Sequence, residues 1–194
     1  MKPKTTIMKK MIFIAVAGCF IMACNNESTD KPKEEKMETK PDATTSNVTY
    51  PYKASYSSDI KMGDANNSKL VLDFFKGWED GSMTGWKDMV ADSVWINFAD
   101  GQHFQLSRDS MMSMAKAFRG MYSNVKLDVE AFLPIHLNDK NEDYVLVWEK
   151  DYSTDKKTNK LDSAGVQSFW QIKNNKITGW QEYNRKLAAT PMKK

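Results

Sequence analysis

The stretch from Gly165 to Lys186 reads GVQSFWQIKNNKITGWQEYNRK. Two runs rich in aromatic and β-branched residues flank Asn174-Asn175, a pair that favours tight turns, so the stretch predicts an antiparallel hairpin. Two further runs of the same type, at 125–137 and 144–152, precede it, and Asn, Asp and Lys fill the breaks between runs. We therefore expect consecutive antiparallel strands in the last third of the chain.

The segment before this sheet has the residue spacing of helices. Large apolar residues recur every three or four positions in 67–81, behind an N-cap at its start, and again in 107–122. A short helix fits 84–90 and a strand fits 94–98, while Pro134 predicts a bulge or kink in its strand. Helices followed by a strand meander predict an α+β fold, with three N-terminal helices packed on a curved, mainly antiparallel sheet.

The N-terminus has the features of an export signal. Residues 11–23 form an uncharged apolar run behind Lys9-Lys10, too short for a membrane span of about 20 residues, so 1–23 is predicted to be a signal peptide. The run ends in Ile21-Met22-Ala23-Cys24, which resembles the lipobox of bacterial lipoproteins. That resemblance implies cleavage before Cys24, attachment of lipid such as palmitate to Cys24, and a membrane anchor in a Gram-negative-type cell envelope.

The residue after Cys24 bears on location. Asn25 stands where an Asp commonly retains lipoproteins at the inner membrane, so the resemblance favours the outer membrane. The alternative is a cleaved secretory signal in which Cys24 is an ordinary residue. Cys19 and Cys24 are the two cysteines of the chain, so the mature domain is expected to have no disulfide and no thiol metal site.

Composition separates a linker from a domain. Residues 25–49 are rich in Lys, Glu, Thr and Asp and nearly free of large apolar side chains, which predicts a disordered segment. We expect a tether and lead-in at 24–62 and a folded domain at 63–194. The chain has a net charge of +3, and four lysines of the predicted leader account for this excess, so no nucleic-acid partner is expected.

Three short motifs support a family resemblance. They are WEDG at 78–81, VADSV at 90–94 and FWQIKNNKIT at 169–178. Together with the order of elements, they resemble the nuclear transport factor 2-like superfamily, which includes SnoaL-like polyketide cyclases and ketosteroid isomerases. The resemblance covers about residues 65–187 and implies a cone-shaped α+β roll whose open end forms a pocket.

The resemblance also bears on catalysis. Steroid isomerases of this superfamily use an Asp near the end of the first strand as a base and a Tyr on the first helix as an oxyanion donor. Alignment through Gly81 and Asp92 places Phe98 and Phe74 at these positions, and neither side chain can transfer a proton. The sequence therefore predicts a hollow without this proton-transferring pair.

Two other groups of residues could carry acid–base chemistry. Asp100 and His103 lie just past the strand, although Asp100-Gly101 is also a plain turn signal. Glu149, Asp151 and Glu182 lie on predicted strands, but alternation does not tell which face is internal, and carboxylates are usually exposed. His103 and His136 are the two histidines, too few to indicate a metal centre, and no cofactor is predicted.

Aromatic residues are numerous enough to line a pocket for a flat apolar ligand, although packing in the core and on the sheet faces is the more common role of such residues. The predicted pocket-lining residues are Phe74, Trp78, Trp95, Phe98, Trp148, Trp170, Trp180 and Tyr183. We expect a membrane-anchored, non-enzymatic module that binds a small apolar ligand or a partner protein. The alternatives are an isomerase or cyclase acting on a carbonyl-containing or polycyclic substrate, and a homodimer formed through the sheet.

Overall fold

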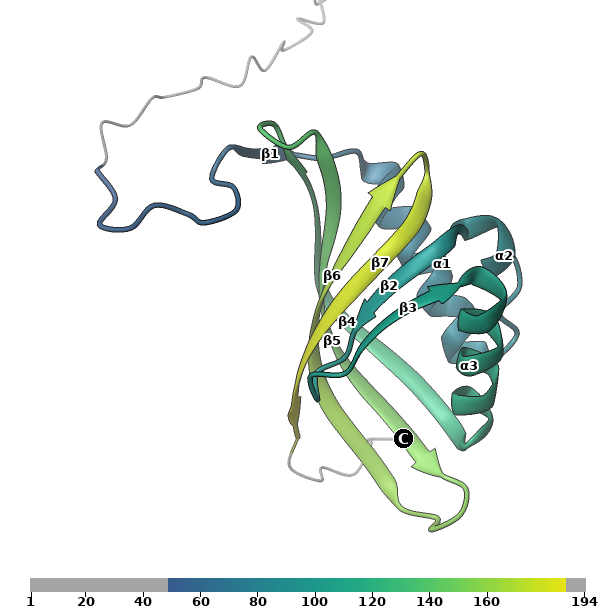
Figure 1. Cartoon of the computed structure of the whole chain (residues 1–194). Helices are drawn as coiled ribbons and strands as arrows, with labels where there is room; N and C mark the ends of the chain where they lie inside the picture. Colours follow the sequence, from purple (N-terminus) through teal and green to yellow (C-terminus); the bar gives the residue numbers. More distant parts are fainter. Residues whose placement is uncertain (1–48, 188–194) are drawn as a thin grey trace, which may run out of the picture. The chain divides into compact units, whose positions relative to one another are not determined.

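Seven strands form one sheet in the order β1-β4-β5-β6-β7-β2-β3 (Figure 1). The computed structural model describes residues 49–187, so the predicted signal peptide and Cys24 lie outside the described residues. Every neighbouring pair is antiparallel except β2 and β7, which run parallel. The strands are β1 Ile60–Met62, β2 Val90–Asn97, β3 His103–Ser107, β4 Tyr122–Leu137, β5 Glu142–Asp155, β6 Leu161–Lys173 and β7 Lys176–Lys186.

Three helices lie on one face of this sheet: α1 Ala65–Asp80, α2 Trp86–Met89 and α3 Arg108–Gly120 (Figure 1). Gly81 ends α1 in the left-handed conformation, with φ of 74°. Helix α3 begins as predicted, because the Ser107 side chain accepts a hydrogen bond from the Ser110 backbone N–H at 3.2 Å. The predicted α+β fold, with three helices on a curved sheet, is confirmed.

Helix α1 begins earlier than its apolar pattern predicts. Asp64 is the N-cap, and its carboxylate accepts from the Asn66 N–H at 2.8 Å. Asn67 and Ser68, which the sequence suggested as the cap, are buried in the first turn instead. The first turn of α1 was not predicted, because its buried residues, Asn67 and Ser68, are polar and do not extend the apolar pattern.

Alternation along the strands assigns one face to the core, and we call the face that the helices cover the inner face. Val145 and Val147 of β5 and Trp170 of β6 are buried on it. They pack against α1, whose Phe74 stacks on Trp86 of α2 with 3.7 Å between ring centroids. Aromatic rings thus fill the space under the helices.

Pro134 does not cause the predicted distortion of β4. It lies in register opposite Val145, and the irregularities of β4 lie at 123–126 and 129–131. The Gly63 N–H donates to the Pro134 carbonyl at 2.9 Å, so the backbone of Pro134 faces β1 and not β5. Strand β1 ends at Met62, which pairs with Ile135, so no residue of β1 lies opposite Pro134. Its missing N–H is therefore not needed by the ladder.

The lead-in before β1 contacts the turn between β4 and β5. Tyr56 donates to Glu142 at 2.6 Å, and the Asn138 amide donates to Asp59 at 2.8 Å.

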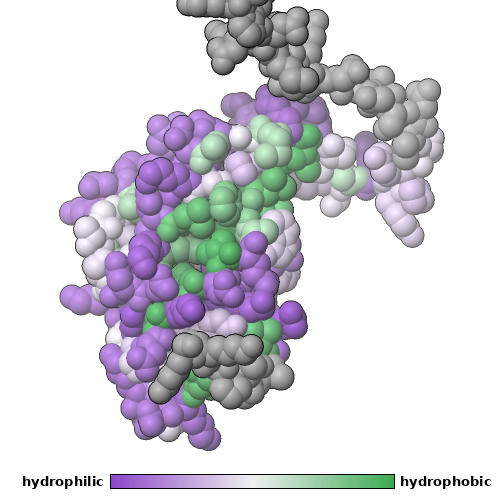
Figure 2. Space-filling model, turned by 180° about the vertical axis from the view of Figure 1, so that it is seen from behind, coloured by the Kyte–Doolittle hydropathy of each residue, from purple (hydrophilic) through white to green (hydrophobic). Residues whose placement is uncertain are grey.

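The face of the molecule turned away in Figure 1 carries a band of apolar side chains between polar margins (Figure 2). Within residues 49–187, no helix has the length and apolarity that crossing a membrane requires.

Candidate functional site

Three carboxylic acids lie on the inner face of the sheet. Glu149 and Asp151 of β5 continue the inward phase of Val147, and Glu182 of β7 continues that of Trp180. Ser168 of β6 links the two strands, because it pairs with Val147 on one side and with Glu182 on the other. The register thus brings the three acids to one region of the inner face, which we call the carboxyl cluster.

Two oxygen atoms of the carboxyl cluster have no hydrogen-bond partner among the described residues. Glu149 is 6% exposed, and its Oε2 atom is buried without a hydrogen-bond partner. The Oδ1 atom of Asp151 is buried and unpartnered in the same way. Glu182 has one partner, since its Oε1 atom accepts from the indole N–H of Trp180 at 2.8 Å. Buried polar atoms without partners cost about 1–3 kcal/mol each, so two in one place indicate a functional constraint.

Burial among apolar neighbours raises the pKa values of the three acids. Burial raises the pKa of Glu149 to about 9, with a further contribution from the charges of Asp151 and Glu182. Burial, followed by the charge of Glu182, raises the pKa of Asp151 to about 7. Burial also raises the pKa of Glu182, opposed by its hydrogen bond from Trp180. On β4, Val129 lies opposite Glu149 and Leu127 opposite Asp151, so the wall beside them is apolar.

These pKa values define what the carboxyl cluster can do. Near neutral pH, Glu149 is protonated and can donate, while Asp151 is partly ionised and can accept a proton. None of the ion pairs among residues 49–187 involves Glu149, Asp151 or Glu182. The same residues contain no group of three or more acidic, His or Cys side chains arranged to hold a metal ion.

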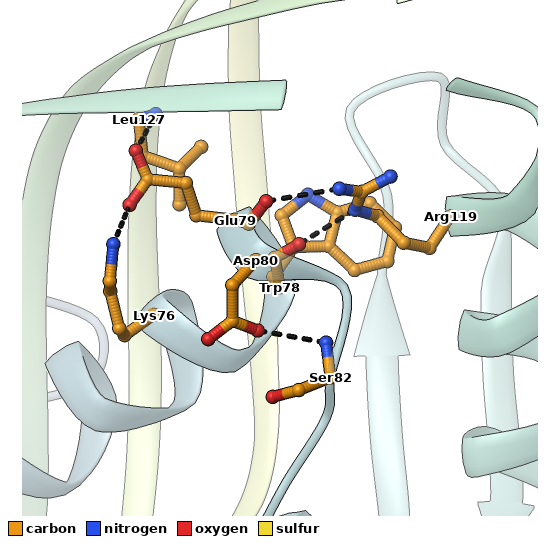
Figure 3. A network of polar contacts seen from close by, with 7 residues as sticks. All are labelled: Lys76, Trp78, Glu79, Asp80, Ser82, Arg119 and Leu127. Atoms are coloured by element: carbon orange, nitrogen blue, oxygen red, sulfur yellow. Dashed lines mark hydrogen bonds and ion pairs between the residues drawn. The ribbon is translucent and has the colours of Figure 1, made fainter. Parts of the chain in front are cut away.

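A second polar network joins the end of α1 to α3 and β4 (Figure 3). Arg119 of α3 donates to the carbonyls of Trp78 and Glu79, at 2.7 Å and 3.0 Å. The Glu79 carboxylate accepts from Lys76 at 2.7 Å and from the Leu127 N–H at 3.5 Å. Because Leu127 lies opposite Asp151, this network fixes the end of α1 against the strand beside the cluster.

The structure does not join Asp100 and His103 into an acid–base pair. Asp100 is exposed in the turn after β2, where it accepts from the backbone and side chain of Gln102 at 3.0 Å and 2.7 Å. His103 is exposed and contacts the side chain of Asn97. Each residue has a different partner, as expected for a turn and a surface loop.

The predicted pocket-lining aromatics divide between the two faces. Five contribute to the inner core or pack against it: Phe74, Trp78, Phe98, Trp170 and Trp180. Trp95, Trp148 and Tyr183 lie on the opposite, outer face, so the prediction of one shared pocket is wrong for these three. Successive side chains of a strand point to opposite faces, and Trp148 lies between the inward residues Val147 and Glu149, so Trp148 points outward.

The structure also places acids on the inner face that the sequence did not assign there. Phe74 and Phe98 do occupy apolar positions, but the acids come from β5 and β7 instead of α1 and β2. A signal for them existed in the sequence. Val145, Val147, Glu149 and Asp151 share one phase of alternation in the sequence, and the burial of the two valines in the structure identifies that phase as internal.

Comparison with known proteins identifies the fold. A putative polyketide cyclase from Acidithiobacillus ferrooxidans aligns with a TM-score of 0.53 and 13% identity, over 62% of this chain and 89% of that chain. An LEH-like epoxide hydrolase from M. tuberculosis aligns with a TM-score of 0.51 and 11% identity, over 62% and 83%. A putative SnoaL-like polyketide cyclase from Jannaschia sp. CCS1 aligns with a TM-score of 0.50 and 10% identity, over 69% and 90%.

No family model and no curated protein sequence matches the chain. At these identities the structural likeness shows the fold. The described domain therefore has the SnoaL-like, nuclear transport factor 2-like fold, as its sequence motifs indicated.

Proposed function

We propose that this protein is a lipoprotein anchored to the membrane through Cys24, whose domain performs acid–base chemistry on a small, mainly apolar substrate. The observation that carries the proposal is the pair of buried, unpartnered oxygens on Glu149 and Asp151. Two carboxyls in one apolar site with different pKa values are suited to act as acid and base. This favours the enzyme alternative over simple binding and assigns it to residues other than Asp100 and His103.

The proposed reaction is a proton shift on a carbonyl-containing substrate. Asp151 as carboxylate removes a proton from the carbon beside the carbonyl, while protonated Glu149 gives its proton to the carbonyl oxygen, which forms the enol. In a substrate with a carbon–carbon double bond at the β,γ position, this enol is a dienol, so Asp151 returns its proton to the γ carbon while Glu149 recovers its proton from the oxygen. The substrate is isomerised, both carboxyls regain their starting states, and no cofactor is consumed.

Access to the acids requires side chains to move, because the unpartnered oxygens are buried. Met111, Met112 and Met114 of α3 belong to or pack against the same core. Methionine side chains rearrange readily, so α3 is the element that can yield to a ligand. The fold also supports an enzyme, since its similar structures include an epoxide hydrolase and putative polyketide cyclases.

A second candidate function is binding without catalysis. The filled aromatic interior around Phe74, Trp86 and Trp170 favours it, because little of the inner face is open. The proposed partner is then a second copy that pairs through the outer face of the sheet. Leu146, Trp148 and Phe169 give that face apolar character, and sedimentation of the protein as a monomer would count against this pairing.

The proposal is tested with a nitrobenzisoxazole, a flat probe whose ring opens when a base removes its C–H proton and which then absorbs visible light. We expect the full-length chain to accelerate ring opening, with a rate that rises as Asp151 ionises near pH 7. Asp151→Asn is expected to lower the rate about tenfold or more. Asp128→Asn removes an exposed carboxylate of β4 and is the matched control. Equal rates for the wild-type protein and Asp151→Asn would contradict the proposal.

A further inference from the structure

Glu182 is an acidic residue that the proton shift does not use. It lies on the inner face of β7, two strands away from Glu149 and Asp151, and one carboxyl oxygen is held by Trp180 at 2.8 Å. The charged groups around Glu182 are acidic. Its charge raises the pKa of Glu149 and of Asp151, and the charge of Asp100 raises the pKa of Glu182. A third acid among these groups adds cost to folding and contributes nothing to an acid–base pair.

Among residues 49–187, no positively charged side chain forms an ion pair with the carboxyl cluster. The ion pairs of residues 49–187 involve Lys69, Lys76, Arg108, His136 and Lys150, and each of these pairs with an acid outside the cluster. Glu149, nine-tenths buried, directs an unpartnered oxygen into the same region. Three carboxyl groups, two with unpartnered oxygens and none paired with a basic side chain among residues 49–187, define a site that a cation carrying N–H groups can complete.

The surroundings favour an organic cation over a metal ion. Residues 49–187 contain no group of three or more ligating side chains arranged for a metal. Leu127 and Val129 line the β4 side, and the indole of Trp180 lies beside Glu182. Apolar and aromatic walls suit the carbon skeleton of an amine, whereas a hydrated metal ion would be poorly accommodated.

We propose that the natural ligand of this site is a small apolar molecule with an ammonium group, and that Glu182 binds this group. The proposal rests on the proposed function, because it names the substrate class of the same site. The ammonium N–H donates to Glu182, and the carbon skeleton lies along Leu127 and Val129 within reach of the Glu149 and Asp151 pair. Glu182 is thus a specificity-determining residue that selects amines over neutral molecules of equal size.

The test compares cyclohexylammonium with cyclohexanol, two probes of similar size that differ in charge. Calorimetric titration of the full-length chain at constant ionic strength is expected to show about tenfold tighter binding of the ammonium. Glu182→Gln is expected to reduce this preference about tenfold, to near equality. Asp128→Asn removes an exposed carboxylate of β4 and is expected to leave the preference unchanged.

Three results would overturn the inference: equal binding of the two probes by the wild-type protein, no binding of the ammonium, or a full preference in Glu182→Gln. If that variant does not fold, Glu182→Asp, which shortens the side chain and keeps its charge, is expected to weaken the preference. The readout is binding alone, whereas the proposed function is tested by turnover. Absence of an ammonium preference in the wild-type protein would contradict this inference alone, whereas retention of activity in Asp151→Asn would contradict the proposed function.

Discussion

The Nε atom of Arg119 donates a hydrogen bond of 2.7 Å to the carbonyl oxygen of Trp78. A second guanidinium nitrogen donates to the Glu79 carbonyl at 3.0 Å, and a third donates to the Tyr122 carbonyl at 3.0 Å. Helix α3 therefore supplies the cap for the last turn of α1, whose carbonyls have no partners within their own helix (Figure 3). A positive charge at this end of a helix is also favoured by the helix dipole.

Replacement of Arg119 by Met is expected to lower the free energy of unfolding by about 2–4 kcal/mol, because three carbonyls lose a charged donor. Arg119→Lys keeps the charge, but a lysine cannot reach three acceptors. The free energy of unfolding of this variant is therefore expected to lie between those of Arg119→Met and the wild type. Urea denaturation measures the effect. Arg185→Met, at an exposed position of β7, is the control, and equal stabilities of the two Met variants would refute the capping role.

Gly179 of β7 is required by Trp95 on the outer face. A Cβ atom at position 179 would lie 2.3 Å from the indole ring, which also donates to Gln171 at 3.0 Å. Gly179→Ala is expected to destabilise the domain by about 1–3 kcal/mol, because Trp95 must leave its position. Gly120→Ala, where a Cβ meets nothing within 4 Å, is the control. A thermal melt in which both variants match the wild type would show that Trp95 is not fixed there.

Long periodic elements were predictable from the sequence, whereas short polar ones were not. Strand β7 begins and ends where its pattern predicts, and α3 begins at the predicted cap. Strand β1 has three exposed residues, and β3 alternates between exposed and half-buried residues. Neither pattern differs from that of a loop. These segments are strands because they pair with β4 and β2, and that pairing is not visible in their own residues.

The site was harder to predict than the fold, because it depends on which face of a strand is internal. Period-two alternation groups Glu149 with Val147 and Trp148 with Leu146, but apolar residues occur in both groups. Trp148 is the larger side chain, so hydrophobicity alone favoured the wrong face. Only the register with β6, which places Val147 opposite the buried Ser168, identifies the inner one.

Lipid attachment at Cys24 is tested by detergent partitioning of the full-length protein. The wild-type protein is expected in the detergent phase and Cys24→Ser in the aqueous phase, because the lipid supplies the membrane affinity. Cys19→Ser, within the predicted signal peptide, is the control and is expected to partition like the wild type. Recovery of the wild-type protein from the aqueous phase would contradict the lipoprotein assignment.

The carboxyl cluster should make the domain less stable as pH rises. The pKa of Asp151 is about 7 and that of Glu149 about 9 in the folded protein, against ordinary values of 3.8 and 4.5. Between the ordinary and the raised values, the folded protein binds more protons than the unfolded chain, so protonation stabilises the fold. The stabilisation is fully present below about pH 4 and is lost progressively as pH rises through 7 and 9.

Glu149→Gln isolates this contribution, because glutamine resembles the protonated acid and does not ionise. Chemical denaturation at several pH values is expected to show a smaller loss of stability for the variant between pH 5 and 9. At pH 9 and above, the variant is expected to be more stable than the wild type, because folding of the wild type must bind a proton or bury the Glu149 charge, whereas glutamine requires neither. Asp128→Asn, whose carboxylate is exposed, should follow the wild-type curve. A wild-type stability that increases across this range, or a Glu149→Gln curve parallel to it, would mean that Glu149 is ionised and solvated in the native state.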